Sequence, residues 1–126
     1  PDIVTVAYGT NDWSHWGVCF DEECPRMIKI LAERYPNAEI FVISPIWRGD
    51  WDRKGSMQRR LPELYQTICE YASPYSNVKV INAWNFVPHP SDFFGDGHLH
   101  PNDLGFGLYA ECLYREIVTH SKLFRT

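Results

Sequence analysis

The sequence predicts an α/β fold in which a parallel sheet is covered by helices on both faces, giving three layers. Apolar runs of strand length alternate along the chain with segments of helical spacing, three of each. The segments between successive strands are long enough for parallel crossovers, which are right-handed and place helices against the sheet. At 126 residues, the chain forms one domain at most.

Three segments have the composition of buried strands. Residues 3–8 (Ile-Val-Thr-Val-Ala-Tyr) form a nearly continuous apolar run, as expected of a strand covered on both faces. Residues 38–44 (Ala-Glu-Ile-Phe-Val-Ile-Ser) and 78–83 (Val-Lys-Val-Ile-Asn-Ala) have the same character. These segments predict the three strands of the sheet.

Three further segments have helical periodicity: residues 25–35, with Pro25 in the first turn, residues 62–72, and residues 103–119, capped by Asn102. Each carries apolar side chains three or four positions apart, which form one face of a helix. These are Ile28, Leu31 and Tyr35 in the first helix, Leu61, Leu64, Tyr65, Ile68 and Ala72 in the second, and Phe106, Ala110, Leu113 and Ile117 in the third.

Three long connections, residues 9–23, 45–60 and 84–102, each follow a predicted strand. They therefore meet at the carboxyl edge of the sheet, where open α/β folds bind ligands. All five tryptophans lie in them, which favours either an aromatic wall for a sugar or acyl substrate or packing that fixes the loops. The five are Trp13, Trp16, Trp47, Trp51 and Trp84.

Composition excludes several classes of protein. A hydrophobic content of 44% provides a core and argues against disorder, and a net charge of −4 offers no electrostatic attraction to nucleic acid or to an anionic membrane. No apolar run approaches the ~18–20 residues that span a bilayer. Cys69 and Cys112 are expected to be buried free thiols, while a pair between Cys19 and Cys24 stays open. This cysteine usage favours a reducing compartment such as the cytoplasm.

The first candidate for chemistry is the segment of residues 94–103, Phe-Gly-Asp-Gly-His-Leu-His-Pro-Asn-Asp. Asp96 precedes His100 by four residues in a glycine-rich loop just before the third helix. A histidine is a natural general base near neutral pH, and a carboxylate that fixes its tautomer improves it. The alternative is a histidine that only caps or packs against the helix.

The second candidate is the segment of residues 9–12, Gly-Thr-Asn-Asp, directly after the first strand. An amide such as that of Asn11 can donate to a developing oxyanion without competing as a base. Asp12 is expected to anchor the turn through backbone hydrogen bonds. An ordinary Asx turn is the alternative.

In their order along the chain, residues 9–12 and then residues 94–103 resemble the last two signature blocks of the SGNH (GDSL-type) hydrolases, and the resemblance covers essentially the whole chain. It implies a flavodoxin-like α/β/α fold and a serine esterase that hydrolyses carboxylic esters, of an acetylated carbohydrate or a short acyl group, through an acyl-enzyme and without a cofactor. By position, His100 is the catalytic base, Asp96 its orienting acid and Asn11 an oxyanion donor. The residues expected to contact substrate are Gly9, Asp12, Trp13, Trp47 and Arg48.

Two departures from the family pattern bear on these assignments. The family more often spaces its acid and base as Asp-x-x-His, so the extra residue here leaves Asp92 as a reserve for Asp96. The Gly-Asp-Ser block with the nucleophile and the later glycine block are absent. Residues 1–126 are therefore expected to be part of an SGNH domain whose N-terminal strand–helix portion is missing, and the chain alone is expected to be inactive and marginally stable or oligomeric.

Two other classes compete with this prediction. One is a carbohydrate-binding module that keeps the aromatic loops without catalysis. The other is a zinc hydrolase using His98 and His100, with Asp92, Asp96 and His89 nearby.

Overall fold

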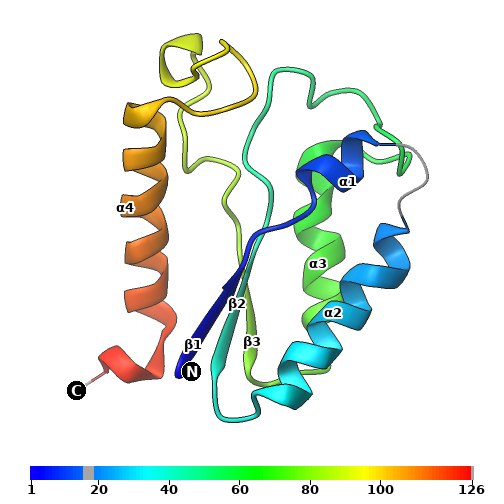
Figure 1. Ribbon diagram of the computed structural model, residues 1–126, viewed down its shortest axis with the longest axis vertical. Helices are drawn as coiled ribbons and strands as arrows, with labels where there is room; N and C mark the ends of the chain where they lie inside the picture. The colour runs from blue at the N-terminus through cyan, green and yellow to red at the C-terminus, as the bar shows by residue number, and fades with distance from the viewer. Residues whose placement is uncertain (16–18, 126) are drawn as a thin grey trace.

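The computed structural model describes residues 1–15 and 19–125, so Trp16 lies outside the described residues. Its parallel sheet contains β1 (Ile3–Val6), β2 (Glu39–Ile43) and β3 (Val78–Ile81) in the order β1-β2-β3. Figure 1 shows helices on both sides of this sheet. The predicted three-layer α/β fold is thus confirmed.

Helices α2 (Phe20–Arg34) and α3 (Leu64–Ala72) lie on one side of the sheet, and α4 (Asp103–His120) lies on the other (Figure 1). A 3₁₀ turn, η1 (Leu61–Glu63), leads into α3, and another, η2 (Ser91–Phe93), precedes the loop before α4. A last 3₁₀ turn, η3 (Lys122–Phe124), follows α4. No helix in the described part of the chain is long and apolar enough to cross a membrane.

Two helix starts differ from the sequence-based expectation. The helix expected to begin at Pro25 begins at Phe20, and three acidic residues occupy its first turn, where the helix dipole favours negative charge. A short helix, α1 (Thr10–Ser14), occupies part of the connection expected to be irregular. Five residues are too few to show a helical period, so the sequence held no signal for α1.

The core is divided between the two faces of the sheet because side chains alternate along a strand. Ile40 and Val42 face α2 and α3, whereas Phe41 and Ile43 face α4. All four are nearly inaccessible to solvent. The central strand β2 is therefore covered on both faces, as its composition predicts.

Strand β1 is not covered on both faces, which corrects the expectation for residues 3–8. Val6 is buried and pairs in register with Val42, which faces α2 and α3, but Thr5 and Ala7 are exposed and Tyr8 is 70% exposed. In the described part of the chain, β1 lies at the edge of the sheet and pairs only with β2, and its carboxyl end opens into the cleft described below.

The apolar face of α4 is also rotated from its predicted position. Leu113 and Ile117 pack against the core as predicted, whereas Phe106 is 56% exposed and Ala110 is exposed. Tyr109 and Cys112 instead complete the face of α4 that packs against the core.

The cysteines form no disulfide. Cys19 is exposed and Cys24 is buried, so the possible pair between them is absent. Cys69 and Cys112 are free as expected, but they are partly rather than fully buried.

Candidate active site

A cleft of about 400 Å³ opens at the carboxyl edge of the sheet, between the ends of β1 and β2 and the start of α4. It brings together segments that are far apart in the sequence, and both predicted chemical segments reach it through Asn11 and His100. Its lining consists of Ala7, Tyr8, Thr10, Asn11, Ile43, Ser44, Pro45, Ile46, Trp47, Arg48, Leu99, His100, Pro101, Phe106 and Tyr109.

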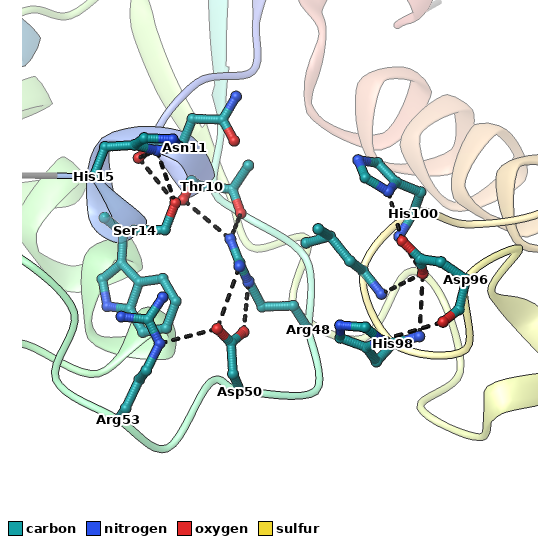
Figure 2. Close-up of polar contacts among 12 residues, drawn as sticks. Thr10, Asn11, Ser14, His15, Arg48, Asp50, Arg53, Asp96, His98 and His100 are labelled. Atoms are coloured by element: carbon teal, nitrogen blue, oxygen red, sulfur yellow. Dashed lines mark hydrogen bonds and ion pairs between the residues drawn. The ribbon is translucent and has the colours of Figure 1, made fainter.

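The loop before α4 pairs the predicted acid with the predicted base. Oδ2 of Asp96 lies 2.6 Å from Nδ1 of His100 (Figure 2). The other carboxylate oxygen, Oδ1, accepts hydrogen bonds from the backbone N–H groups of Leu99 at 2.8 Å, His100 at 3.0 Å and His98 at 3.2 Å. Gly97 adopts a φ of +83°, a conformation that glycine takes without strain, and this lets the chain turn around the carboxylate.

These hydrogen bonds determine the charge on Asp96 and the tautomer of His100. The backbone N–H groups of Leu99 and His100, with smaller effects from the His100 ring and the His98 N–H, hold the pKa of Asp96 far below its usual range. An ionised carboxylate only accepts hydrogen bonds, so Nδ1 of His100 carries the proton it donates to Asp96. In the neutral imidazole, Nε2 is then free to accept a proton.

The histidine itself is open to the cleft. Its side chain is 77% exposed, and no group in residues 1–15 and 19–125 hydrogen-bonds its Nε2. Pro101 follows it and pairs with Phe94 in an isolated antiparallel bridge. Asn102 then caps α4 by accepting from the backbone N–H of Gly105 at 2.9 Å. The bridge and the cap thus fix the two ends of this loop, while the ring of His100 stays accessible.

Asp92, the reserve candidate, does not contact the base. Its backbone carbonyl accepts a hydrogen bond of 2.6 Å from the amide of Asn102, so the residue helps to fix the start of α4. The structure pairs His100 with Asp96.

The segment after β1 presents Asn11 at the opposite side of the cleft. Gly9 turns the chain with a φ of +126°, and an added Cβ there would lie 3.3 Å from the ring of Pro45. Gly9 is buried, so it shapes the turn rather than a contact surface for substrate. Asn11 is exposed in the first turn of α1, and its side-chain amide has no hydrogen-bond partner in the described part of the chain.

Two residues expected to contact substrate lie elsewhere. Trp13 is completely buried, and its ring N–H donates to the carbonyl of Arg59 at 2.6 Å, so the residue belongs to the core. Asp12 lines a separate, mainly apolar pocket with Phe20 and Met27 beside α2. Neither residue lines the cleft, because α1 turns both side chains away from it.

Arg48 and Trp47 do line the cleft, but each has structural partners as well. The Arg48 side chain donates to both carboxylate oxygens of Asp50 and lies over the Trp13 ring. Trp47 is half-buried and stacks on the ring of His89, with the ring centres 4.9 Å apart.

The remaining aromatic side chains mostly fix the long loops. Trp84 packs edge-on against Trp51 and against His89. Of the four described tryptophans, only Trp47 lines the cleft. Loop packing therefore accounts for most of the tryptophans in these connections.

Neither a serine nucleophile nor a metal site is assembled in the described residues. Ser44 is the one serine in the cleft lining, and it is 4% exposed with its hydroxyl accepting from the backbone N–H of Ala83 at 3.0 Å. In residues 1–15 and 19–125, no three His, Cys, Asp or Glu side chains are placed to hold a metal ion. Nδ1 of His98 contacts the backbone carbonyl of Asp96 rather than a metal position shared with His100.

Sequence reasoning missed the residues that hold the site together. Thr10 and Gly49 carry no signature by themselves, and their partners, Arg48 and His98, are distant in sequence. It also missed Phe106 and Tyr109 as cleft residues, because their spacing in a helix indicates only core packing.

The carboxylate–histidine pair thus lies at the carboxyl edge of the sheet in a three-layer α/β domain. Residues 1–108 match the family model of the GDSL-like lipase/acylhydrolases. The chain belongs to this family, which confirms the resemblance found in the sequence. None of the curated proteins is similar enough in sequence to count as a match.

Several solved structures share the fold. A protein from Lactobacillus plantarum has a TM-score of 0.76 at 19% identity, over 95% of this chain and 68% of the other. A carbohydrate esterase family 2 enzyme with a carbohydrate binding domain, from Corynascus thermopiles (Myceliophthora fergusii), gives 0.69 at 22%, over 94% and 37%. A carbohydrate esterase family 3 protein from Talaromyces cellulolyticus gives 0.65 at 20%, over 94% and 58%. In another structure, with a TM-score of 0.79 at 16% identity, this chain covers 66% of the other chain's length.

Proposed function

We propose that this chain supplies the general base, its orienting carboxylate and a side-chain oxyanion donor of a serine esterase. The observation that carries the proposal is the 2.6 Å contact between Nδ1 of His100 and Asp96, in a cleft that Asn11 also lines. Base and amide donor thus face one space in which a carbonyl group can react.

Each residue has a defined task in this proposal. Nε2 of His100 takes the proton of a serine hydroxyl as its oxygen attacks the ester carbonyl, and Asp96 stabilises the resulting imidazolium. The amide of Asn11 donates to the oxyanion of the tetrahedral intermediate. His100 then returns the proton to the departing alcohol and activates the water that hydrolyses the acyl-enzyme.

The nucleophilic serine is proposed to come from a further strand and helix of the same domain, before residue 1. The support is an unfinished surface. β1 lies at the edge of the sheet with Thr5 and Ala7 exposed, and the neighbouring face of α4 leaves Phe106 and Tyr114 exposed as well. One more parallel strand beside β1 with its crossover helix would cover these apolar groups.

The proposed substrate is a carboxylic ester with a compact acyl group. The cleft is lined mainly by apolar and aromatic groups, and its volume of about 400 Å³ suits a short acyl chain or an acetylated sugar. Likeness to two carbohydrate esterases supports the second of these.

Ester hydrolysis by the whole protein that carries this chain tests the proposal. With p-nitrophenyl acetate as substrate, Asn11→Ala is expected to lower kcat by about 10²–10³-fold, the effect of removing one oxyanion donor. His120→Ala, a change on the far end of α4, is the control and should leave kcat unchanged. An unaltered protein without esterase activity, or an Asn11→Ala variant as active as the control, would contradict the proposal.

A further inference from the structure

The loop after β2 connects the two sides of the site, one of which carries Asn11 and the other His100. Asn11 belongs to the segment after β1 and His100 to the loop before α4, and neither segment contacts the other in the hydrogen bonds of the described residues. The loop after β2 lies between them, and Figure 2 shows Arg48 in the space separating Thr10 from the His98–His100 turn. In this loop, Arg48 bonds the segment that carries Asn11, and Gly49 bonds the loop that carries His100.

Arg48 holds the Asn11 side. Its Nη1 atom lies 3.4 Å from both the carbonyl and the hydroxyl oxygen of Thr10, the residue before Asn11. Its Nε donates to Asp50 at 2.6 Å and its Nη2 to the other carboxylate oxygen at 3.3 Å. The guanidinium also lies over the ring of Trp13, 5.2 Å from its centre.

This arginine is 9% exposed, which is unusual for a charged side chain at a cleft. A buried charge is tolerated when it is paired and its N–H groups are bonded. Burial would raise the pKa of Asp50, but hydrogen bonds from Arg48 and Arg53 outweigh that effect and hold it below its usual range, so the carboxylate stays charged. Arg48 is therefore fixed from two sides before it reaches Thr10.

Gly49 holds the His100 side. Its backbone N–H donates to the carbonyl of His98 at 2.7 Å, which bonds the two loops directly. A Cβ added to Gly49 would lie 2.7 Å from Cβ of His98, closer than side-chain carbons approach one another. Only glycine lets the turn that carries His100 lie this near.

We propose that Arg48 and Gly49 are positioning residues that together set the placement of Asn11 relative to His100. Arg48 fixes the backbone that presents the amide donor, and Gly49 seats the loop that presents the base. Because the two are adjacent in sequence, a shift on one side is transmitted to the other. This inference rests on the proposed function of Asn11 and His100.

Kinetics of the whole protein test the first half. Arg48→Met keeps much of the packing on Trp13 and removes the bonds to Thr10, so kcat should fall about 10- to 100-fold while KM changes little, as expected of a misplaced catalytic group. Arg53→Met is the matched control, because Arg53 also bonds Asp50, at 2.9 Å, and lies over the Trp13 ring, but does not reach Thr10. It should stay within about twofold of the unaltered protein.

A double-mutant cycle shows whether Arg48 acts through Asn11. In the Asn11→Ala background, Arg48→Met should cost little further activity, since there is no amide left to position. A full additional loss in that background would overturn the proposal. Arg48→Lys is included because it retains the charge but cannot bond Asp50 and Thr10 in the same geometry, so it should lose nearly as much kcat as Arg48→Met; unaltered kcat in a folded Arg48→Lys protein would also overturn it.

Amide hydrogen exchange tests the same proposal without relying on catalysis. Arg48→Met should speed exchange at the backbone N–H of Trp13, which bonds the carbonyl of Gly9 at 2.9 Å. Gly49→Ala should speed exchange at the backbone N–H of Gly95, which bonds the carbonyl of His100 at 2.8 Å. Arg53→Met should alter neither. Unchanged exchange in both variants would overturn the positioning role, whereas changed exchange in a protein without esterase activity would support positioning and overturn only the proposed function.

Discussion

The carboxylate of Asp96 both fixes the loop before α4 and orients the ring of His100. One carboxylate oxygen lies 2.6 Å from Nδ1 of the ring, and the other accepts three consecutive backbone N–H groups, including that of His100 itself. Loop geometry and ring orientation therefore depend on the same side chain. This explains how an acid and a base four residues apart meet without a helix between them.

Replacing this carboxylate should impair catalysis by the whole protein more than replacing any nearby acid. In Asp96→Asn, the amide cannot accept from three backbone groups and the ring as a charged carboxylate does, so kcat is expected to fall by about 10²–10⁴-fold. Asp92→Asn is the matched control, since the side chain of Asp92 does not contact His100. Initial rates on p-nitrophenyl acetate measure both. Equal losses in the two variants would mean that Asp96 has no special role.

The low pKa of Asp96 makes a prediction about acid. Because its pKa is below the unfolded value of about 4, Asp96 stabilises the fold fully at pH values above about 4, and this contribution shrinks as the pH falls from there through the folded value. The ¹³C shift of its carboxyl carbon should hence stay constant from pH 7 to about 4. The stability deficit of Asp96→Asn, measured by urea unfolding, should be largest near neutral pH and shrink below about 4. A carboxyl that titrates near its ordinary value would contradict the bonding described for the loop.

Two glycines near the start of α4 should respond in opposite ways to alanine. A Cβ at Gly105 would lie 2.4 Å from the backbone oxygen of Phe93, so Gly105→Ala should destabilise the protein by about 1–3 kcal/mol and displace the loop before α4. A Cβ at Gly107 meets nothing within 4 Å, so Gly107→Ala should stabilise the helix by up to about 1 kcal/mol. Urea unfolding of the two variants measures both changes in the free energy of unfolding. Stabilisation by both variants would show that helix propensity, rather than contact with Phe93, controls this turn.

The cysteines should differ sharply in reactivity. Burial, with smaller effects from Asp12 and Asp21, raises the pKa of Cys24 to about 11, so very little thiolate forms near pH 8. Iodoacetamide should label the exposed Cys19 first and Cys24 only after unfolding, as peptide mass spectrometry can measure. Early labelling of Cys24 in the native protein would contradict the packing of α2.

The sequence predicted those parts of the fold that depend on local periodicity. The three strands, the helix after Asn102 and the pairing of the two chemical segments at one sheet edge follow from apolar spacing and from parallel topology. Trp13 was misplaced because an aromatic residue in a loop is equally compatible with a cleft and with a core. Arg48 was expected to meet substrate, and its bond to Thr10 joins residues 38 positions apart, which no local pattern encodes.

The central claim is that His100 is the base for a serine nucleophile, and fluorophosphonate labelling of the whole protein tests it most directly. The unaltered protein should form a covalent adduct on a serine outside this chain, and His100→Ala should abolish it, while His98→Ala, which removes the neighbouring ring, should still label. No adduct in the unaltered protein, or labelling that survives His100→Ala, would contradict the account; in the first case, binding of acetylated sugars without turnover would indicate a carbohydrate-binding module instead.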